Sequence, residues 1–143
     1  MTFLDVYPLI TTPDLTEVRS FYPRWFEATL SFDSSWFVLF TLPGERPFSL
    51  AFMSPDHPSR PPGPEPFGGL GMILTLQVAD AAVLYERLRD GGLTPYHPLC
   101  DEPWGQRRFM VRDPAGLLLD VVEQTEPSPG FWDAYLPDHL PTP

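Results

Sequence analysis

One architectural unit occurs twice in the sequence. Two aspartates with the features of helix N-caps, Asp14 and Asp80, lie about 66 residues apart. A strand pattern precedes each of them, and an amphipathic helical pattern and three further strand patterns follow. A repeat of this length restricts the chain to two small units of the same architecture. The sequence therefore predicts an α+β fold built from two tandem βαβββ modules.

The first module shows a helix flanked by strand-like segments. Asp14 and Glu17 have the spacing of a capping box, although Thr12, with Pro13 at the first helical position, is an alternative start. Pro23 should kink or end this helix, because proline cannot donate the intrahelical hydrogen bond. The strands of this module are expected at Leu4–Thr11, Leu30–Ser34, Ser35–Leu42 and Phe48–Met53.

The second module repeats the order with clearer boundary signals. Asp80 should cap its helix, and Gly91-Gly92 should end it as a C-terminal cap. The segment 113–116, Asp-Pro-Ala-Gly, is a tight turn that joins the last two strands. The strands of this module are expected at Gly71–Val78, Thr94–Leu99, Gln106–Arg112 and Leu117–Val122.

The boundaries follow from these patterns. Module one covers residues 3–54 and module two covers residues 69–124 of a single 143-residue domain, which has no break in composition. The proline-rich segment 55–68 should be an extended linker without a core, a spacer rather than a lid. The tail, residues 125–143, should dock on the chain's own helix, a partner subunit or the binding site. Its apolar residues are Phe131, Trp132, Tyr135 and Leu136.

Charge and cysteine content restrict partners and location. The net charge of −10, with no lysine, disfavours nucleic acid and anionic membranes and tolerates a cationic small molecule. Cys100 is the single cysteine, so no internal disulfide can form and a reducing compartment is expected. The N-terminus lacks the features of a signal peptide, and no apolar run approaches the ~20 residues of a membrane helix. These features favour a cytoplasmic protein.

Two segments together resemble a known superfamily. They are "PDLTEVRSFYPRWF" after the first strand and "PWGQRRFMVRDPAGLLLDVVE" at the end of module two. In this order the chain resembles the vicinal oxygen chelate superfamily of glyoxalases, bleomycin-resistance proteins and extradiol dioxygenases, and most closely the metal-free bleomycin-resistance branch. The resemblance implies a cup-shaped mixed sheet with helices on its convex side. It also implies a small-molecule ligand and a homodimer, because that branch builds its clefts across two chains.

The metal ligands of the enzymatic members are not filled in this sequence. In those members the residue seven places after the turn aspartate is a metal-binding glutamate, and here it is Asp120. The other ligand positions hold Tyr7 and Ile73, and residues 49–51 contain no carboxylate or imidazole. A divalent transition metal needs three or four N, O or S donors, so we expect neither a metal nor another cofactor. The histidines also lack ligand spacing to one another: His57, His97 and His139.

Strand alternation predicts which side chains line the ligand site. If Asp120 faces the ligand, Leu119 packs against the helices, and on the neighbouring strand Arg108 faces the ligand while Phe109 takes the core side. Arg108 could then pair with Asp120, or both could meet water. Trp104 matches a tryptophan that stacks on planar ligands in bleomycin-resistance-like proteins. The expected ligand-binding residues are Tyr7, Trp36, Ile73, Trp104, Arg108, Met110 and Asp120.

Three functions are compatible with these residues. The leading hypothesis is a metal-independent protein that sequesters an antibiotic or natural product, planar and possibly cationic. The second is a lyase, isomerase or dioxygenase of the same superfamily, which the unfilled ligand positions disfavour. The third is a metal-free enzyme with Asp120 and Tyr7 as proton-transfer groups. A nucleophilic pair of Cys100 and His97 is not expected, because residues three apart on an extended segment point in opposite directions.

Overall fold

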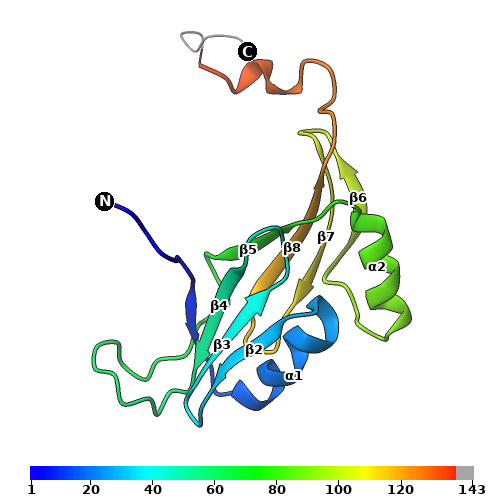
Figure 1. The fold of residues 1–143 in the computed structure, drawn as a ribbon. Coiled ribbons are helices and arrows are strands. Elements are labelled where there is room, and N and C mark those ends of the chain that lie inside the picture. The colour runs from blue at the N-terminus through cyan, green and yellow to red at the C-terminus, as the bar shows by residue number, and fades with distance from the viewer. Residues whose placement is uncertain (138–143) are drawn as a thin grey trace. The chain divides into compact units, whose positions relative to one another are not determined.

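The structure, a computed structural model, describes residues 1–137 and has the predicted α+β fold of two tandem βαβββ modules (Figure 1). Each module contributes one helix and one four-stranded sheet. By their internal contacts, residues 1–72 and 112–118 form one compact unit, and of the described residues, 73–111 and 119–137 form the other. The turn between the last two strands therefore groups with the first module. No helix within residues 1–137 is both long and apolar enough to cross a membrane.

The first sheet has the strand order β1-β4-β3-β2, and β1 runs parallel to β4. Its strands are β1 (Leu9–Thr11), β2 (Thr29–Asp33), β3 (Phe37–Leu42) and β4 (Phe48–Met53). The expected strand Leu4–Thr11 is too long, because regular pairing begins only after Pro8. Proline cannot donate to a ladder. The carbonyl of Pro8 still accepts from the amide of Ala51 at 3.0 Å, and the strand starts at the next residue.

The helix of this module, α1 (Leu15–Phe26), differs from the prediction at both ends. Asp14 occupies the N-cap position, but its side chain makes no capping hydrogen bond, so the predicted capping box does not form. Its amide instead donates to Thr12 Oγ1 at 3.1 Å. Pro23 does not end the helix, which continues to Phe26 and stops at Glu27 in a left-handed conformation. Only one intrahelical donor is lost at a proline this close to the C-terminus.

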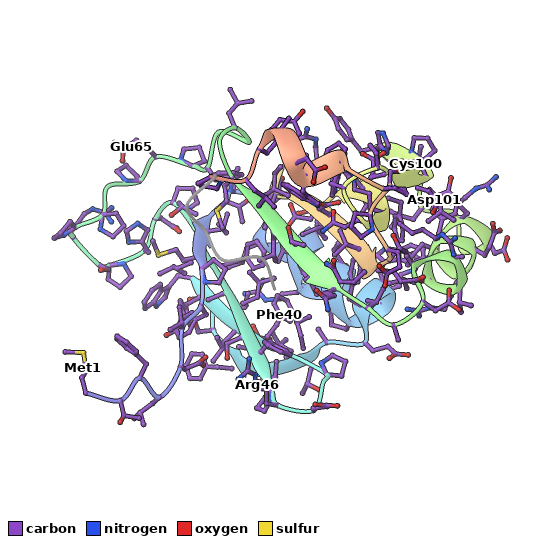
Figure 2. All side chains as sticks on the ribbon, turned by 90° about the horizontal axis from the view of Figure 1, so that it is seen from above. Met1, Phe40, Arg46, Glu65, Cys100 and Asp101 are labelled. Carbon is purple, nitrogen blue, oxygen red and sulfur yellow. The ribbon has the colours of Figure 1, made fainter. Side chains whose placement is uncertain are left out.

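The core of the first module forms around Tyr22. Its ring lies 5.3 Å from the ring of Phe40 and 5.4 Å from the ring of Phe52, measured between centroids. These two phenylalanines lie on the same face of the sheet, because Phe40 pairs with Leu50 and Phe52 lies two residues further along that strand. All three side chains are fully buried, and Figure 2 labels Phe40. The apolar periodicity of α1 is therefore explained by burial against β3 and β4.

The predicted Asp-Pro-Ala-Gly turn is tied to this core by its aspartate. The Tyr22 hydroxyl donates to Asp113 Oδ2 at 2.5 Å, and the amides of Ala115 and Leu117 donate to Oδ1 at 2.9 and 2.8 Å. Asp113 is buried, and burial raises the pKa of its carboxyl, which these hydrogen bonds partly offset. Gly116 accepts the positive φ of 85° that closes the turn.

We expect Tyr22→Phe to lower the free energy of unfolding by about 1–3 kcal/mol, because it removes a donor from a buried carboxylate oxygen. Urea denaturation of the purified protein measures this change. Tyr85→Phe is the matched control, since Tyr85 is a buried helix tyrosine whose hydroxyl makes no hydrogen bond within residues 1–137. Equal losses in the two variants would show that the Asp113 hydrogen bond contributes nothing.

The second module has the predicted order of elements, but the strand expected at Thr94–Leu99 lies at His97–Glu102, because Pro95 cannot donate to a ladder. Its sheet has the order β5-β8-β7-β6. Asp80 caps the helix through a hydrogen bond from the Val83 amide at 3.1 Å, and Gly92, with a φ of 98°, ends it. The Leu93 amide donates to the carbonyl of Leu88 at 2.9 Å, the pattern of a Schellman motif. The elements are β5 (Ile73–Gln77), α2 (Ala81–Asp90), β6 (His97–Glu102), β7 (Gln106–Arg112) and β8 (Leu118–Gln124).

The proline-rich segment 55–68 contains no helix or strand, but it is not simply extended. It folds around His57, whose side chain is 1% exposed. His57 Nε2 lies 3.0 Å from the carbonyl oxygen of Gly63, and Arg60 Nη1 donates to the His57 carbonyl at 2.6 Å. The segment is therefore not extended throughout, and hydrogen bonds within the loop compensate the burial of the imidazole.

Candidate ligand-binding site

An irregularity in β6 changes the prediction for Cys100 and His97. β6 is an edge strand, and its register with β7 shifts between His97, which pairs with Met110, and Cys100, which pairs with Arg108. One residue of β7, Phe109, thus faces two of β6, Pro98 and Leu99, as at a β-bulge. The bulge brings Cys100 Sγ to 4.0 Å from His97 Nδ1, so the expectation that these side chains point in opposite directions is wrong. Pro98 lies within the bulge, at a position where proline is tolerated in a strand.

The predicted alternation along β7 is confirmed. Phe109 is buried, and its ring lies 5.1 Å from the ring of Tyr85 on α2, so Phe109 lies on the helix side of the sheet. Arg108 therefore lies on the opposite side, which we call the open face. Polar and sulfur-containing side chains from β6, β7, β8 and the β6–β7 turn meet around Arg108 there. We call this group the Arg108 cluster, and it consists of Cys100, Glu102, Trp104, Arg108, Met110 and Asp120.

Arg108 is the centre of the cluster. Its Nη1 lies 3.5 Å from Asp120 Oδ1, which confirms the predicted ion pair, and its Nη2 lies 3.3 Å from Glu102 Oε2. The guanidinium carbon lies 5.2 Å from the ring centroid of Trp104, within the range of a cation–π interaction. The Arg108 side chain is 20% exposed, and those of Glu102 and Asp120 are 16% and 12% exposed. One cation is therefore shared by two partly buried carboxylates, whose charge it offsets only in part.

The ion pair with Asp120 is incomplete. Asp120 Oδ1 and Arg108 Nε are both buried, and neither has a hydrogen-bond partner within the described residues. Burial raises the pKa of Asp120, and the nearby Arg108 only partly counteracts that rise. The carboxylate thus keeps a desolvation cost that its neighbours do not fully repay.

Cys100 is a hydrogen-bond donor rather than a nucleophile. Its thiol donates to Glu102 Oε1 at 3.0 Å. Burial raises the pKa of this thiol to about 11, with further contributions from Glu102. Because the thiolate is the reactive form of cysteine, a protonated Cys100 is inert at neutral pH. Its contact with His97 therefore does not make a catalytic pair.

The C-terminal tail docks on the turn that carries Trp104. This segment, orange in Figure 1, contains the short 3-10 helix η1 (Phe131–Ala134). The ring of Phe131 lies 6.3 Å from the ring of Trp104, and Trp132 Nε1 donates to the Trp104 carbonyl at 3.0 Å. The sequence left the chain's own helix, a partner subunit and the binding site open, and the described tail contacts the β6–β7 turn at Trp104, one of the expected ligand-binding residues. His139 lies outside the described residues.

Gly105 allows the tail to cross this turn closely. Gly105 lies in the β6–β7 turn, and its carbonyl oxygen accepts a hydrogen bond from the Thr125 amide at 2.8 Å. A Cβ atom at Gly105 would lie 2.9 Å from the carbonyl oxygen of Thr125 and 3.2 Å from Pro127. The φ of 108° is also a conformation that favours glycine.

Gly105→Ala is expected to cost more stability than Gly92→Ala. Both glycines have a positive φ, so each substitution should cost about 1–2 kcal/mol of backbone strain. Only Gly105 would also place its Cβ against backbone, since no atom lies within 4 Å of a Cβ at Gly92. Thermal melting compares the variants, and the indole NMR signal of Trp132 reports whether the tail detaches. Equal losses with an unchanged Trp132 signal would contradict the close crossing.

The structure assembles part of the predicted ligand site. It brings Trp104, Met110 and Asp120 into contact with Arg108. Ile73 begins β5 and is 52% exposed. Residues an even number apart on a strand share a face, so Ile73 lies on the face of Gln77, and Gln124 lies on the face of Asp120. Gln77 accepts a hydrogen bond from Gln124 at 3.2 Å, which places Ile73 on the open face.

Two predicted residues belong to the first module. Tyr7 precedes β1 and is 43% exposed, and Trp36 is half-buried in the bend before β3. Sequence analysis missed Glu102, which holds both Arg108 and Cys100. Two features of the sequence could have indicated Glu102. It lies two residues after Cys100, so the two side chains share a face of the strand, and Pro98 marks a bulge.

The Arg108 cluster does not fit a divalent metal. Its two carboxylates face a guanidinium instead of further donors. Within residues 1–137 no three His, Cys, Asp or Glu side chains are arranged to hold a metal ion. A metal at Asp120 would lie beside a permanent positive charge. The chemistry of the donor set therefore favours an organic ligand.

We expect the free energy of unfolding of the wild type, measured relative to that of Asp120→Asn, to fall as the pH rises. The folded-state pKa of Asp120 lies above its ordinary value of 3.8, so the folded protein holds more protons than the unfolded chain just above that pH. The stabilisation is complete below pH 3.8 and is lost as the pH rises through the folded pKa. Urea denaturation of both proteins at a series of pH values measures the difference. A difference that grows with pH would contradict the raised pKa.

Comparison with known proteins agrees with this fold. The family model of the Glyoxalase/Bleomycin resistance protein/Dioxygenase superfamily matches residues 6–121, so the chain belongs to this superfamily. No curated protein matches the chain by sequence.

Similar folds occur in several solved structures. A glyoxalase/bleomycin resistance protein/dioxygenase from Nocardioides is 25% identical, with a TM-score of 0.71 over 91% of this chain and 89% of that chain. A superfamily member from Sphaerobacter thermophilus is 24% identical, with a TM-score of 0.68 over 87% and 98% of the two chains. A lactoylglutathione lyase from Agrobacterium tumefaciens is 20% identical, with a TM-score of 0.66 over 86% and 95%. The last two comparisons show a shared fold.

Proposed function

We propose that this protein is a metal-independent binding protein of the bleomycin-resistance type, which sequesters a planar, cationic antibiotic or natural product. One observation carries the proposal. The guanidinium of Arg108, itself a planar cation, lies over Trp104 between Glu102 and Asp120. The open face of the second module thus already holds the kind of group that we propose as ligand.

Charge supports a cationic ligand. The chain carries a net charge of −10, and the cluster has two carboxylates for one guanidinium. A depression of about 370 Å³ lies beside the cluster, where the tail meets the β6–β7 turn. It is lined by Arg107 and by three carboxylates, of which Glu102 also belongs to the cluster. A field of this sign raises the local concentration of cations. These carboxylates are Asp101, Glu102 and Glu126.

Aromatic stacking supports a planar ligand. Tryptophan is the strongest cation–π partner among the aromatic side chains, with about 0.5–2 kcal/mol for each contact. Trp104 is half-buried, and its indole N–H donates to Gln106 Oε1 at 2.8 Å, which fixes the orientation of the ring. A ring held in this way loses little further freedom when a ligand stacks on it. The resemblance to the bleomycin-resistance branch supports a homodimer, and the single cysteine supports a cytoplasmic location.

A lyase, isomerase or dioxygenase is the alternative within the superfamily. Metal analysis of the purified protein and turnover assays with a hemithioacetal and a catechol distinguish it from a binding protein. A stoichiometric, tightly held Zn, Ni, Mn or Fe ion, or turnover of either substrate, would overturn the proposal.

We expect Trp104→Ala to weaken binding of a planar aromatic cation about 5- to 30-fold, because one stacking contact of about 1–2 kcal/mol is lost. Isothermal titration calorimetry against a panel of cationic, neutral and anionic aromatic compounds measures the effect. Trp25→Ala is the matched control, since Arg24 also stacks on Trp25, at 4.3 Å, but the site lies on α1. The proposal fails if no cation in the panel binds, or if both variants bind it as the wild type does.

A further inference from the structure

Arg108 is held less firmly than Arg107 and Arg19. Its nearest carboxylate oxygens lie at 3.3 and 3.5 Å, and its Nε makes no hydrogen bond within the described residues. By contrast, Arg107 Nε donates to Asp101 at 2.7 Å, and Arg19 Nε donates to Asp33 at 2.9 Å. Charge-assisted hydrogen bonds are normally about 2.7–2.9 Å long. The contacts of Arg108 are therefore loose even though its surroundings are more buried than those of Arg107.

Asp120 shows the complementary deficiency. The residue is 8% exposed, and its Oδ1 is buried without a hydrogen-bond donor in the described part of the chain. A buried carboxylate oxygen without a donor is costly, and a donor at normal distance would recover part of this cost. The cluster thus contains an acceptor that Arg108 neutralises but does not satisfy.

We infer that Arg108 is a displaceable internal occupant of a cation site formed by Trp104, Glu102 and Asp120, and that it sets the affinity and selectivity of this site. The inference rests on the proposed binding function. The ligand that fits is a planar amidinium or guanidinium, which can stack on Trp104 and donate to both carboxylates. In the absence of ligand, Arg108 keeps the two carboxylates from being buried without a counter-charge, which would destabilise the fold. When the ligand binds, Arg108 gives up loose contacts and swings out to solvent.

The direction of the effect distinguishes this role from an ordinary contact residue. A residue that binds the ligand weakens binding when it is removed. A residue that competes with the ligand strengthens binding when it is removed, because the site no longer has to be vacated first. The gain should be limited to cations, since a neutral molecule cannot replace the charge of Arg108 between two carboxylates.

The test compares Arg108→Met with Arg19→Met, using benzamidinium as the probe and neutral benzamide as its isostere. Methionine keeps an unbranched apolar chain of similar length next to Met110. Arg19 lies on α1 and pairs with Asp33, so its substitution changes the net charge equally but leaves the candidate site unaltered. By calorimetry, Arg108→Met should bind benzamidinium at least about tenfold more tightly than the wild type, because the ligand no longer has to displace a charge-assisted contact. Arg19→Met should bind as the wild type does, and benzamide should gain nothing in either variant.

A second measurement uses the wild type and does not depend on the folding of the variant. The Nε–H group of Arg108 lies near the ring of Trp104, so its NMR signal carries a ring-current shift. Benzamidinium should remove this shift as Arg108 leaves the ring, while the signal of Arg107 stays in place. An Arg108 signal that does not move on saturation with benzamidinium would overturn the inference, even if Arg108→Met is unfolded.

The outcomes separate the inference from the function on which it rests. If benzamidinium and the larger aromatic cations bind neither the wild type nor Arg108→Met, the proposed function itself is wrong. If they bind the wild type and Arg108→Met binds them equally or more weakly, the function stands and Arg108 is a contact residue. Equal strengthening for benzamide would also overturn the inference, because it would show a gain of space rather than the removal of a competing cation.

Discussion

The buried carboxylate of Asp113 is the interaction on which the rest of the structure depends. An ionised group in a protein interior costs several kcal/mol unless donors surround it, and here the donors come from the Tyr22 hydroxyl and from amides of the turn itself. The turn and the helix α1 therefore share one buried carboxylate. The same turn joins β7 to β8, the two strands that carry Arg108 and Asp120.

Asp120 illustrates how a residue can be costly for stability and useful for binding. It interrupts an aliphatic strand, its pKa is raised by burial, and one of its oxygens has no donor in the described structure. Replacing such a carboxylate with an apolar residue is often neutral or stabilising, so packing alone does not account for its presence. Glu102 approaches the same guanidinium from β6. Two carboxylates that share one loosely held cation keep a net negative charge, so they attract a further cation. The partial burial of both carboxylates makes this attraction stronger than it would be in water.

The sequence predicted the features that depend on local chemistry and on strand parity. The repeat, the Asp80 cap, the Gly91-Gly92 stop and the closing turn follow from residue preferences over a few positions. The pairing of Arg108 with Asp120 follows from the alternation of two adjacent strands. The bulge at Pro98 could not be placed in this way, because one inserted residue moves every following side chain to the other face, and it is this shift that sets Cys100 and His97 side by side. The docking of the tail on Trp104 depends on contacts between segments far apart in the sequence.

Under the proposed function, the cluster also explains how a binding protein can keep the fold of metal-dependent enzymes. Resemblance to those enzymes implies a metal-binding carboxylate at the position of Asp120, and a carboxylate in that place needs positive charge nearby. In this chain a tethered guanidinium supplies the charge, so the strand keeps its acidic residue without three further metal ligands. A guanidinium gives planarity, hydrogen-bond donors and a stacking surface in place of a metal's coordination sphere. A site built around such a group selects for molecules that share its shape and charge, and the weakness of its own contacts is what leaves room for a ligand to compete.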